Sequence, residues 1–124
     1  MSNNKKKRAV IFNVEGAVER GNKKGKELGF PTANIPCDSS IPGGIYAGEA
    51  VWNGNIYQAA LYKEDKKDIV EAHLLDFSGD LYGEKLAVLA HKKVRDVRMF
   101  AEREELIAAI LKDIADIRKL CSRE

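Results

Sequence analysis

The chain is poor in the residues that build cross-linked, metal-bound or membrane-spanning proteins. Its 124 residues include two cysteines, two histidines and three prolines. Cys37 and Cys121 lie far apart, so neither a zinc site nor a disulfide framework is expected, and both thiols should be reduced. No apolar run is long enough to cross a bilayer, and no apolar signal region follows the N-terminal charges. The cytoplasm is therefore the expected compartment, with no membrane partner.

Neither positive nor negative residues are in large excess. The formal net charge is +2, and aromatic residues do not alternate with basic ones, so no nucleic-acid partner is expected. A basic cluster, Lys5 to Arg8, lies in residues 1–8, which we interpret as a disordered tail, with a nucleic-acid-binding arm as the alternative. The length suits one domain, residues 9–124, without room for a second catalytic domain. We expect a monomer.

Most of the chain is expected to form short strands. Apolar and β-branched runs predict strands at residues 9–13, 45–52, 55–62, 69–77 and 86–94, with a short extended piece at 81–83. Asn53-Gly54 joins two of these runs and is typical of a type I′ hairpin. Residues 35–44 and 63–68 are expected to be loops, the second one charged and solvated. In the last run, Leu86, Val88, Ala90 and Val94 are expected on one face.

From about residue 101 the apolar spacing changes to three and four. This spacing predicts an amphipathic helix whose apolar stripe consists of Ile107, Ile110, Ile114, Ile117 and Cys121. Several short strands followed by one such helix favour a mainly β protein. We expect an antiparallel barrel covered by that helix.

The stretch from residue 16 to residue 34 could hold a phosphate group. It contains four of the ten glycines, with lysines between them. Glycines let backbone N–H groups approach a phosphate, and Lys24 and Lys26 add positive charge. The stretch is neither a Walker loop nor a dinucleotide fingerprint. A glycine-lysine loop without a ligand is the alternative.

Two polar side chains follow this loop behind a proline. Pro31 restricts the chain, and Thr32 and Asn34 are separated by one residue, so in an extended segment they face the same way. A hydroxyl and an amide oxygen are hard ligands that suit Mg²⁺ shared with phosphate. We therefore predict a metal site at Thr32 and Asn34.

Glu71 is an acid within the apolar run 69–77. It either points to solvent or faces a cleft, where it could accept a proton from an alcohol. Phosphoryl transfer needs such a group to orient the attacking hydroxyl.

Two motifs resemble those of ATP-dependent riboflavin kinases (flavokinases). The first is the spaced run Gly-x-Val-x-x-Gly-x-x-x-Gly-x-x-Leu-Gly-Phe-Pro-Thr-Ala-Asn that ends at Asn34. The second combines Val70-Glu71, Leu74-Leu75-Asp76-Phe77 and Asp80-Leu81-Tyr82-Gly83. The resemblance runs from about Gly16 to the end of the chain. It implies a six-stranded antiparallel Greek-key barrel with a C-terminal helix, which converts ATP and riboflavin to ADP and FMN with Mg²⁺.

The resemblance also implies roles for individual residues. Glu71 would be the catalytic base for the ribityl 5′-hydroxyl. Nucleotide-binding residues would be Gly21, Lys24, Gly25, Lys26, Gly29, Pro31, Thr32 and Asn34. Flavin-binding residues would be Asp80, Tyr82, Arg95 and Phe100. For Arg95 and Phe100, a surface ion pair and a helix-docking contact are the respective alternatives.

The chain departs from the family pattern at several points. Residues 61–68 replace a longer segment that helps to enclose the site, and Val97 stands where an acid often follows the Val94-Arg95 pair. A flavin- or nucleotide-binding module without turnover is therefore the alternative function. An adenylyltransferase domain is not expected, and FMN would be the final product.

Overall fold

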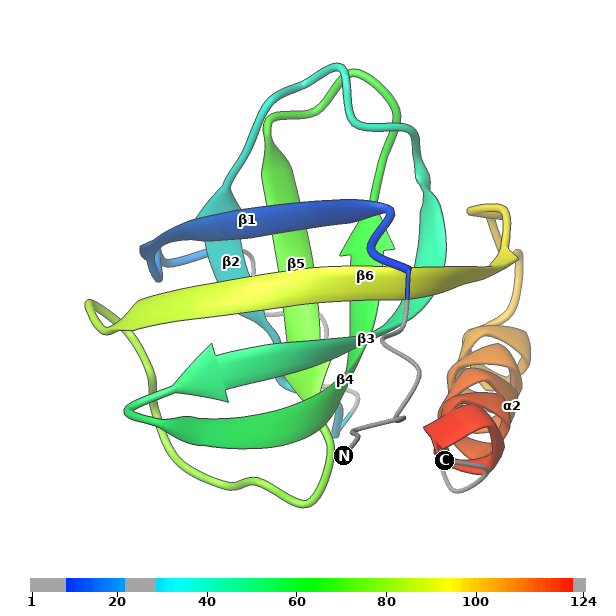
Figure 1. The fold of residues 1–124 in the computed structure, drawn as a ribbon. Coiled ribbons are helices and arrows are strands. Elements are labelled where there is room, and N and C mark those ends of the chain that lie inside the picture. The colour runs from blue at the N-terminus through cyan, green and yellow to red at the C-terminus, as the bar shows by residue number, and fades with distance from the viewer. Residues whose placement is uncertain (1–8, 22–28, 122–124) are drawn as a thin grey trace.

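The computed structural model describes residues 9–21 and 29–121. Its elements are β1 (Phe12–Ala17), β2 (Ala33–Pro36), β3 (Gly44–Trp52), β4 (Asn55–Lys63), β5 (Ile69–Leu74), β6 (Lys85–Arg95) and α2 (Arg103–Cys121). Figure 1 shows the strands wrapped around a common centre, with the helix against one side. The predicted tail, residues 1–8, lies outside the described residues.

The strands form one six-stranded sheet in the order β1-β6-β3-β4-β5-β2. Every neighbouring pair is antiparallel. Strands β3, β4 and β5 follow one another, and β6 returns to lie beside β3, which is a Greek-key arrangement. A bridge between Glu19 and Asn34 brings the two edges of the sheet together. The predicted barrel with its C-terminal helix is thus confirmed.

The β3–β4 hairpin turns at Asn53-Gly54. Trp52 pairs with Asn55, and the φ angles of Asn53 and Gly54 are +53° and +82°. Two consecutive positive φ values define the type I′ turn that matches the twist of the flanking strands. The hairpin prediction is therefore correct in both position and turn type.

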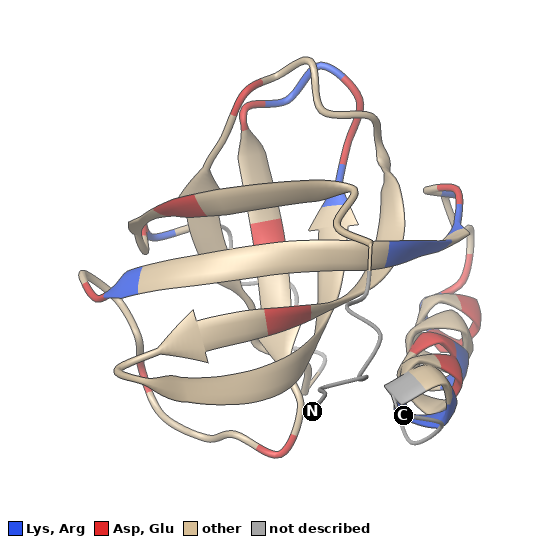
Figure 2. Ribbon diagram, in the orientation of Figure 1, with Lys and Arg blue, Asp and Glu red and all other residues tan. Residues whose placement is uncertain are grey.

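The side chains of β5 point alternately into the barrel and to its outer face. Val70, Ala72 and Leu74 are buried in the main core cluster. Side chains alternate along a strand, so Glu71 and His73 lie on the outer face. Glu71 is the acid of β5, and Figure 2 shows this strand with red within its length. The same alternation puts Ala33 and Ile35 of β2 in the core and leaves Asn34 on the outer face.

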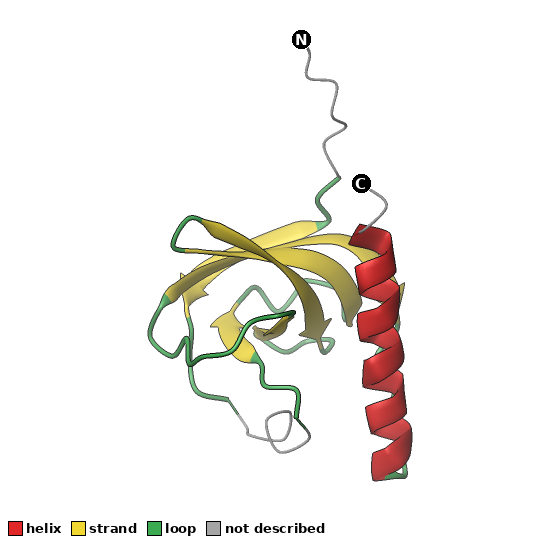
Figure 3. Cartoon of the chain, turned by 90° about the horizontal axis from the view of Figure 1, so that it is seen from below, coloured by secondary structure: helices red, strands yellow, loops and turns green. Residues whose placement is uncertain are grey.

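Helix α2 covers part of this outer face. A second apolar cluster joins the sheet to the C-terminal half of the helix, and it consists of Ala47, Ala60, Leu75, Val94, Ile114, Ile117 and Leu120. Ile107 and Ile110, nearer the start of the helix, are only partly buried. In Figure 3 the end of the helix remote from the C-terminus projects past the strands. No helix of the described residues is long and apolar enough to cross a membrane.

Several strand boundaries differ from those expected. The first strand runs over Phe12–Ala17 rather than 9–13, and β5 ends at Leu74, three residues early. The sixth strand is β2, Ala33–Pro36, whereas residues 35 and 36 were expected in a loop. The piece 81–83 is a turn. β2 was missed because it has only four residues and contains a proline, which sequence patterns associate with loops.

The surroundings of two side chains, Val94 and Lys63, differ from those predicted. Two register shifts between β3 and β6 leave His91 and Val94 without a partner in β3, and Val94 packs towards α2 instead of the barrel core. Lys63 was expected in a solvated loop but is fully buried. Its ammonium group donates to the carbonyl oxygens of Ile41 at 3.0 Å and Glu64 at 2.7 Å. The lysine thereby joins the loop after β2 to the end of β4.

Candidate functional site

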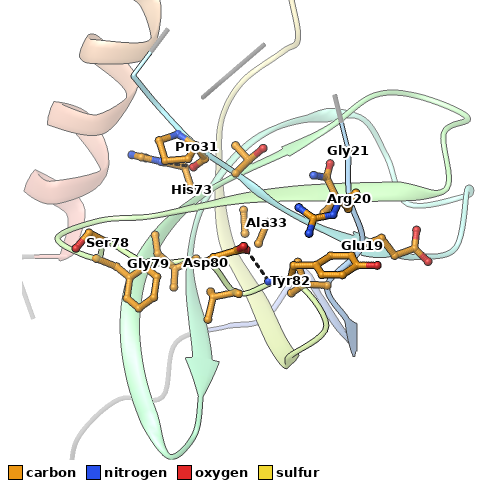
Figure 4. Close-up of a pocket in the computed structure, with 17 residues that line it drawn as sticks. Glu19, Arg20, Gly21, Pro31, Ala33, His73, Ser78, Gly79, Asp80 and Tyr82 are labelled. Carbon is orange, nitrogen blue, oxygen red and sulfur yellow. Dashed lines mark hydrogen bonds between the residues drawn. The ribbon is translucent and has the colours of Figure 1, made fainter. Parts of the chain in front are cut away.

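A cavity of about 420 Å³ opens between four segments, residues 18–21, 31–34, 72–74 and 77–82. Figure 4 shows the side chains around it. Backbone hydrogen bonds fix the walls to one another. The N–H of Gly83 donates to the carbonyl of Val18 at 2.9 Å, and the N–H of Glu19 donates to the carbonyl of Asn34 at 2.8 Å. Segments that are distant in sequence therefore form one continuous wall.

Gly21 lies directly against the side chain of Asn34. A Cβ atom at this glycine would come within 2.5 Å of Asn34 Cγ, which no real contact tolerates. Asn34 is buried, with 8% of its surface exposed. The absence of a side chain at Gly21 therefore sets where the Asn34 amide lies in the cavity wall.

We expect Gly21→Ala to weaken nucleotide binding, because the new methyl group must displace Asn34. Gly16→Ala is the matched control, since a Cβ there would make an ordinary 3.5 Å contact with Ile35 Cγ2. Titration of each variant with ADP and Mg²⁺ by calorimetry measures the effect. A loss of about tenfold in affinity is expected for Gly21→Ala alone, the size of effect reported for groups that orient metal ligands. Equal affinity in the two variants would contradict this role.

Thr32, Asn34 and Glu71 lie together on the outer face. Asn34 and Glu71 are directly paired in the β2–β5 register. The Thr32 hydroxyl donates to Glu71 Oε1 at 3.2 Å. Thr32 and Asn34 line the cavity, whereas Glu71 is not among its lining residues. Thr32 therefore lies between the cavity and the carboxylate.

The environment of Glu71 makes its carboxyl harder to ionise than a solvated one. Burial is the largest influence and raises the pKa of this carboxyl above its ordinary value. The hydrogen bond from Thr32 opposes the shift, and the nearby charge of Glu64 adds to it. A carboxylate with a raised pKa is a better proton acceptor than a solvated one.

His73 positions the segment that carries Thr32. Its Nδ1 lies 2.8 Å from the carbonyl oxygen of Pro31, and its ring meets that of Phe30 edge-on at 5.9 Å. No role in the site was predicted for His73 from the sequence. The available signal was its spacing of two from Glu71, which places both on the outer face.

Arg20, Asp80 and Tyr82 form the mouth of the cavity. The Arg20 guanidinium stacks 4.0 Å from the centre of the Tyr82 ring, as Figure 4 shows. The N–H of Tyr82 donates to Asp80 Oδ1 at 2.9 Å, which closes the turn that presents both residues. Asp80 and Tyr82 were predicted for a flavin site, yet they share this cavity with Gly21, Thr32 and Asn34.

Arg95 and Phe100 lie elsewhere, between β6 and α2. Arg95 makes a bidentate ion pair with Asp113, with both N···O distances 2.8 Å. Its guanidinium is 5.8 Å from the centre of the Phe100 ring. Neither residue is among those that line the cavity. The alternative considered for Arg95 was a surface ion pair, whereas the pair with Asp113 is largely buried, and it holds the Arg95 side chain in place.

A family model described as riboflavin kinase (flavokinase) matches residues 9–121. The chain belongs to the riboflavin kinase family. Among curated relatives, the bifunctional riboflavin kinase/FMN adenylyltransferase of Pseudomonas fluorescens is 38% identical over 121 residues. That alignment covers 90% of this chain and 39% of the relative, so the chain spans less than half the length of such relatives.

Solved structures show the same fold. The riboflavin kinase of Trypanosoma brucei superposes with a TM-score of 0.67 at 23% identity, covering 89% of this chain and 79% of that one. A Streptococcus pneumoniae protein named a macrolide-efflux protein superposes with a TM-score of 0.77 at 25% identity. This alignment covers 86% of our chain and 38% of the other.

Several residues that the riboflavin kinase resemblance predicted cannot be placed. Lys24, Gly25 and Lys26 lie outside the described residues. Gly29 is described, with a φ of +93°, but it is not among the cavity-lining residues.

The described residues contain no group of three or more His, Cys, Asp or Glu side chains arranged for a metal ion. The predicted metal donors are therefore only the neutral side-chain oxygens of Thr32 and Asn34, which lie near the Glu71 carboxylate.

Proposed function

We propose that the chain transfers the γ-phosphoryl group of ATP to the 5′-hydroxyl of riboflavin, giving ADP and FMN. The observation that carries the proposal is the position of Thr32, which lines the cavity and hydrogen-bonds to Glu71 outside it. A phosphate donor in the cavity and an alcohol beside Glu71 would meet at this hydroxyl. Phosphoryl transfer requires mainly that geometry, together with neutralisation of charge.

The nucleotide is assigned to the cavity. Gly21 leaves room for backbone N–H groups to approach phosphate, and Arg20 places a cation at the mouth. We also assign Asp80 and Tyr82 to the nucleotide, because they line the same cavity. This differs from their predicted place at the flavin. Lys24 and Lys26 stay predictions.

Thr32 and Asn34 would hold a divalent cation, which we propose to be Mg²⁺. Their hydroxyl and amide oxygens are hard donors of the kind that Mg²⁺ takes. Two neutral oxygens cannot satisfy an octahedral ion, so the remaining positions suit phosphate oxygens and water. When bound, the cation would neutralise charge on the phosphates.

The flavin is assigned to the outer face, between Glu71 and the pair Arg95 and Phe100. Glu71 would accept the proton of the 5′-hydroxyl as its oxygen attacks the γ-phosphorus and the bond to the ADP oxygen breaks. The raised pKa of Glu71 suits proton transfer from an alcohol. The partly buried Ile107 and Ile110 on the first half of α2 offer apolar surface for a flavin ring.

Formation of FMN from ATP and riboflavin, followed by chromatography with and without Mg²⁺, tests this proposal. We expect FMN only when all three are present. Binding of ADP and FMN without turnover would replace the kinase by a binding module of the same family. Binding of neither ligand would refute both. We further propose that the protein works as a monomer in the cytoplasm.

A further inference from the structure

Tyr62 lies between the proposed base and the proposed flavin residues. In the sheet register it is directly opposite Glu71 on β5 and Ile45 on β3. Ile45 is in turn opposite Arg95 on β6. Directly paired residues of antiparallel strands have their side chains on the same face. The row Glu71, Tyr62, Ile45 and Arg95 therefore crosses four strands on the outer face of the barrel.

This row has the length of a substrate that must reach from Arg95 to Glu71. Neighbouring strands are ~4.8 Å apart, so three spacings separate the two ends by roughly 14 Å. A tricyclic ring that carries a five-carbon chain is of comparable length. Tyr62 is on the same side of the sheet as α2, because Ala60, two residues earlier in β4, packs against that helix. The ring of Tyr62 thus forms part of the floor beneath the proposed flavin position.

The side chain of Tyr62 is held in its neutral state. It is half-buried, and it hydrogen-bonds to Glu64. Burial first, then the charges of Glu64 and Glu71, raise the pKa of Tyr62 to about 12. The phenol therefore remains neutral at any working pH.

Tyr62 and Glu64 lie within residues 61–68, the segment in which the sequence predicts a departure from the family pattern. It begins in β4 and ends in the charged turn after Lys63. The buried ammonium of Lys63 donates to three backbone carbonyl oxygens, including that of Glu64. The backbone on both sides of Tyr62 is thus fixed, by the β4–β5 ladder and by this lysine.

We propose that Tyr62 is a positioning residue for the alcohol substrate, whose flavin ring stacks on the Tyr62 ring so that the 5′-hydroxyl reaches Glu71. This inference rests on the proposed function and adds to it a residue that selects a planar aromatic alcohol. A stacked ring fixes the distance along the row, while Arg95, itself held by Asp113, limits the far end. Aromatic stacking is tolerant of substituents but requires a flat partner.

Three variants at this position test the inference. Tyr62→Leu removes the aromatic face, Tyr62→Phe keeps it without the hydroxyl, and Tyr62→Trp enlarges it. For Tyr62→Leu we expect the KM for riboflavin to rise about tenfold, the size of effect found when stacking on an aromatic residue is lost. The KM for ATP should not change, because Tyr62 is not among the cavity-lining residues. Tyr62→Phe and Tyr62→Trp should restore the lower KM for riboflavin.

The quenching of flavin fluorescence on binding tests the stacking directly, because it should not change if Tyr62 had only a structural role. Stacking on an aromatic side chain quenches the flavin, so binding of FMN should quench less in Tyr62→Leu than in the unchanged chain or in Tyr62→Phe. Thermal unfolding of each variant checks that it is folded. Equal KM for riboflavin and equal quenching in Tyr62→Leu would overturn the inference. So would a Tyr62→Phe variant as impaired as Tyr62→Leu, because the ring would then not be the part that acts.

These results separate the inference from the function on which it rests. If the unchanged chain forms FMN and Tyr62→Leu matches it in every respect, only the role of Tyr62 is wrong. If the unchanged chain forms no FMN, the kinase proposal is wrong, and the inference as stated fails with it whatever the FMN quenching shows.

Discussion

Glu71→Gln is expected to lose nearly all FMN formation while it still binds ADP and riboflavin. The amide keeps the shape of the carboxylate and can still accept the hydrogen bond from Thr32, but it cannot take a proton from the substrate hydroxyl. Loss of a general base costs about 10² to 10⁴ in rate. We therefore expect kcat to fall by at least about 10²-fold with little change in either KM.

The same substitution is expected to stabilise the protein near neutral pH. The pKa of Glu71 is raised in the folded state, mainly by burial, so ionisation is less favourable there than in the unfolded chain. Such a carboxyl contributes stability at low pH. This stability is lost as the pH rises from the ordinary pKa of a glutamate through the raised pKa of the folded state. The melting temperature of Glu71→Gln should therefore exceed that of the unchanged chain at pH 8, and the gap should narrow towards pH 4.

Glu15→Gln is the matched control for both measurements. Glu15 is an acid on β1 that pairs with Lys85 at 3.7 Å, and both side chains are largely exposed. Its loss should change neither kcat nor the melting temperature by a measurable amount, since exposed ion pairs contribute little. Near-normal FMN formation by Glu71→Gln would remove Glu71 from the mechanism, even if the chain is a kinase.

The barrel and its helix could be predicted because several independent signals agree. Asn53-Gly54 specifies the hairpin by itself, and the isoleucines at 107, 110, 114 and 117 specify one helical stripe. The short β2 could not be predicted, because its four residues carry too little pattern. Its pairing with β5 depends on contacts between residues almost forty positions apart. Lys63 was placed wrongly because nothing local shows that three carbonyl oxygens surround its ammonium group.

The candidate site, like the fold, could be predicted only in part. Thr32, Asn34 and Glu71 were grouped from the sequence, and the structure brings them together through the β2–β5 register. The proposed division between a nucleotide side and a flavin side could not be predicted from the sequence, since it depends on which loops meet. The turn that presents Asp80 and Tyr82 folds back on Val18, so these residues join the cavity. Spacing along the chain contains no information about that contact.

Thr32→Val is expected to have the second-largest effect on catalysis. Valine retains the branched shape of threonine but removes the hydroxyl, which we propose both holds the cation and donates to Glu71. We expect kcat/KM for ATP to fall by about 10- to 100-fold, the usual cost of losing a group at a metal ligand. Thr32→Ser should recover most of the activity, because the hydroxyl is the part that acts.

The two proposed roles of Thr32 can be distinguished by two further measurements. The hydrogen bond from Thr32 lowers the pKa of Glu71, so its removal should move the acidic limb of the pH–rate profile to higher pH. Asn34→Ala should leave that limb in place, because Asn34 makes no such bond in the described residues. Both variants should require more Mg²⁺ to bind ADP, measured by calorimetry. A normal Mg²⁺ requirement combined with a shifted pH limb would limit Thr32 to orienting the base, and the metal site would then have to be sought elsewhere along the cavity.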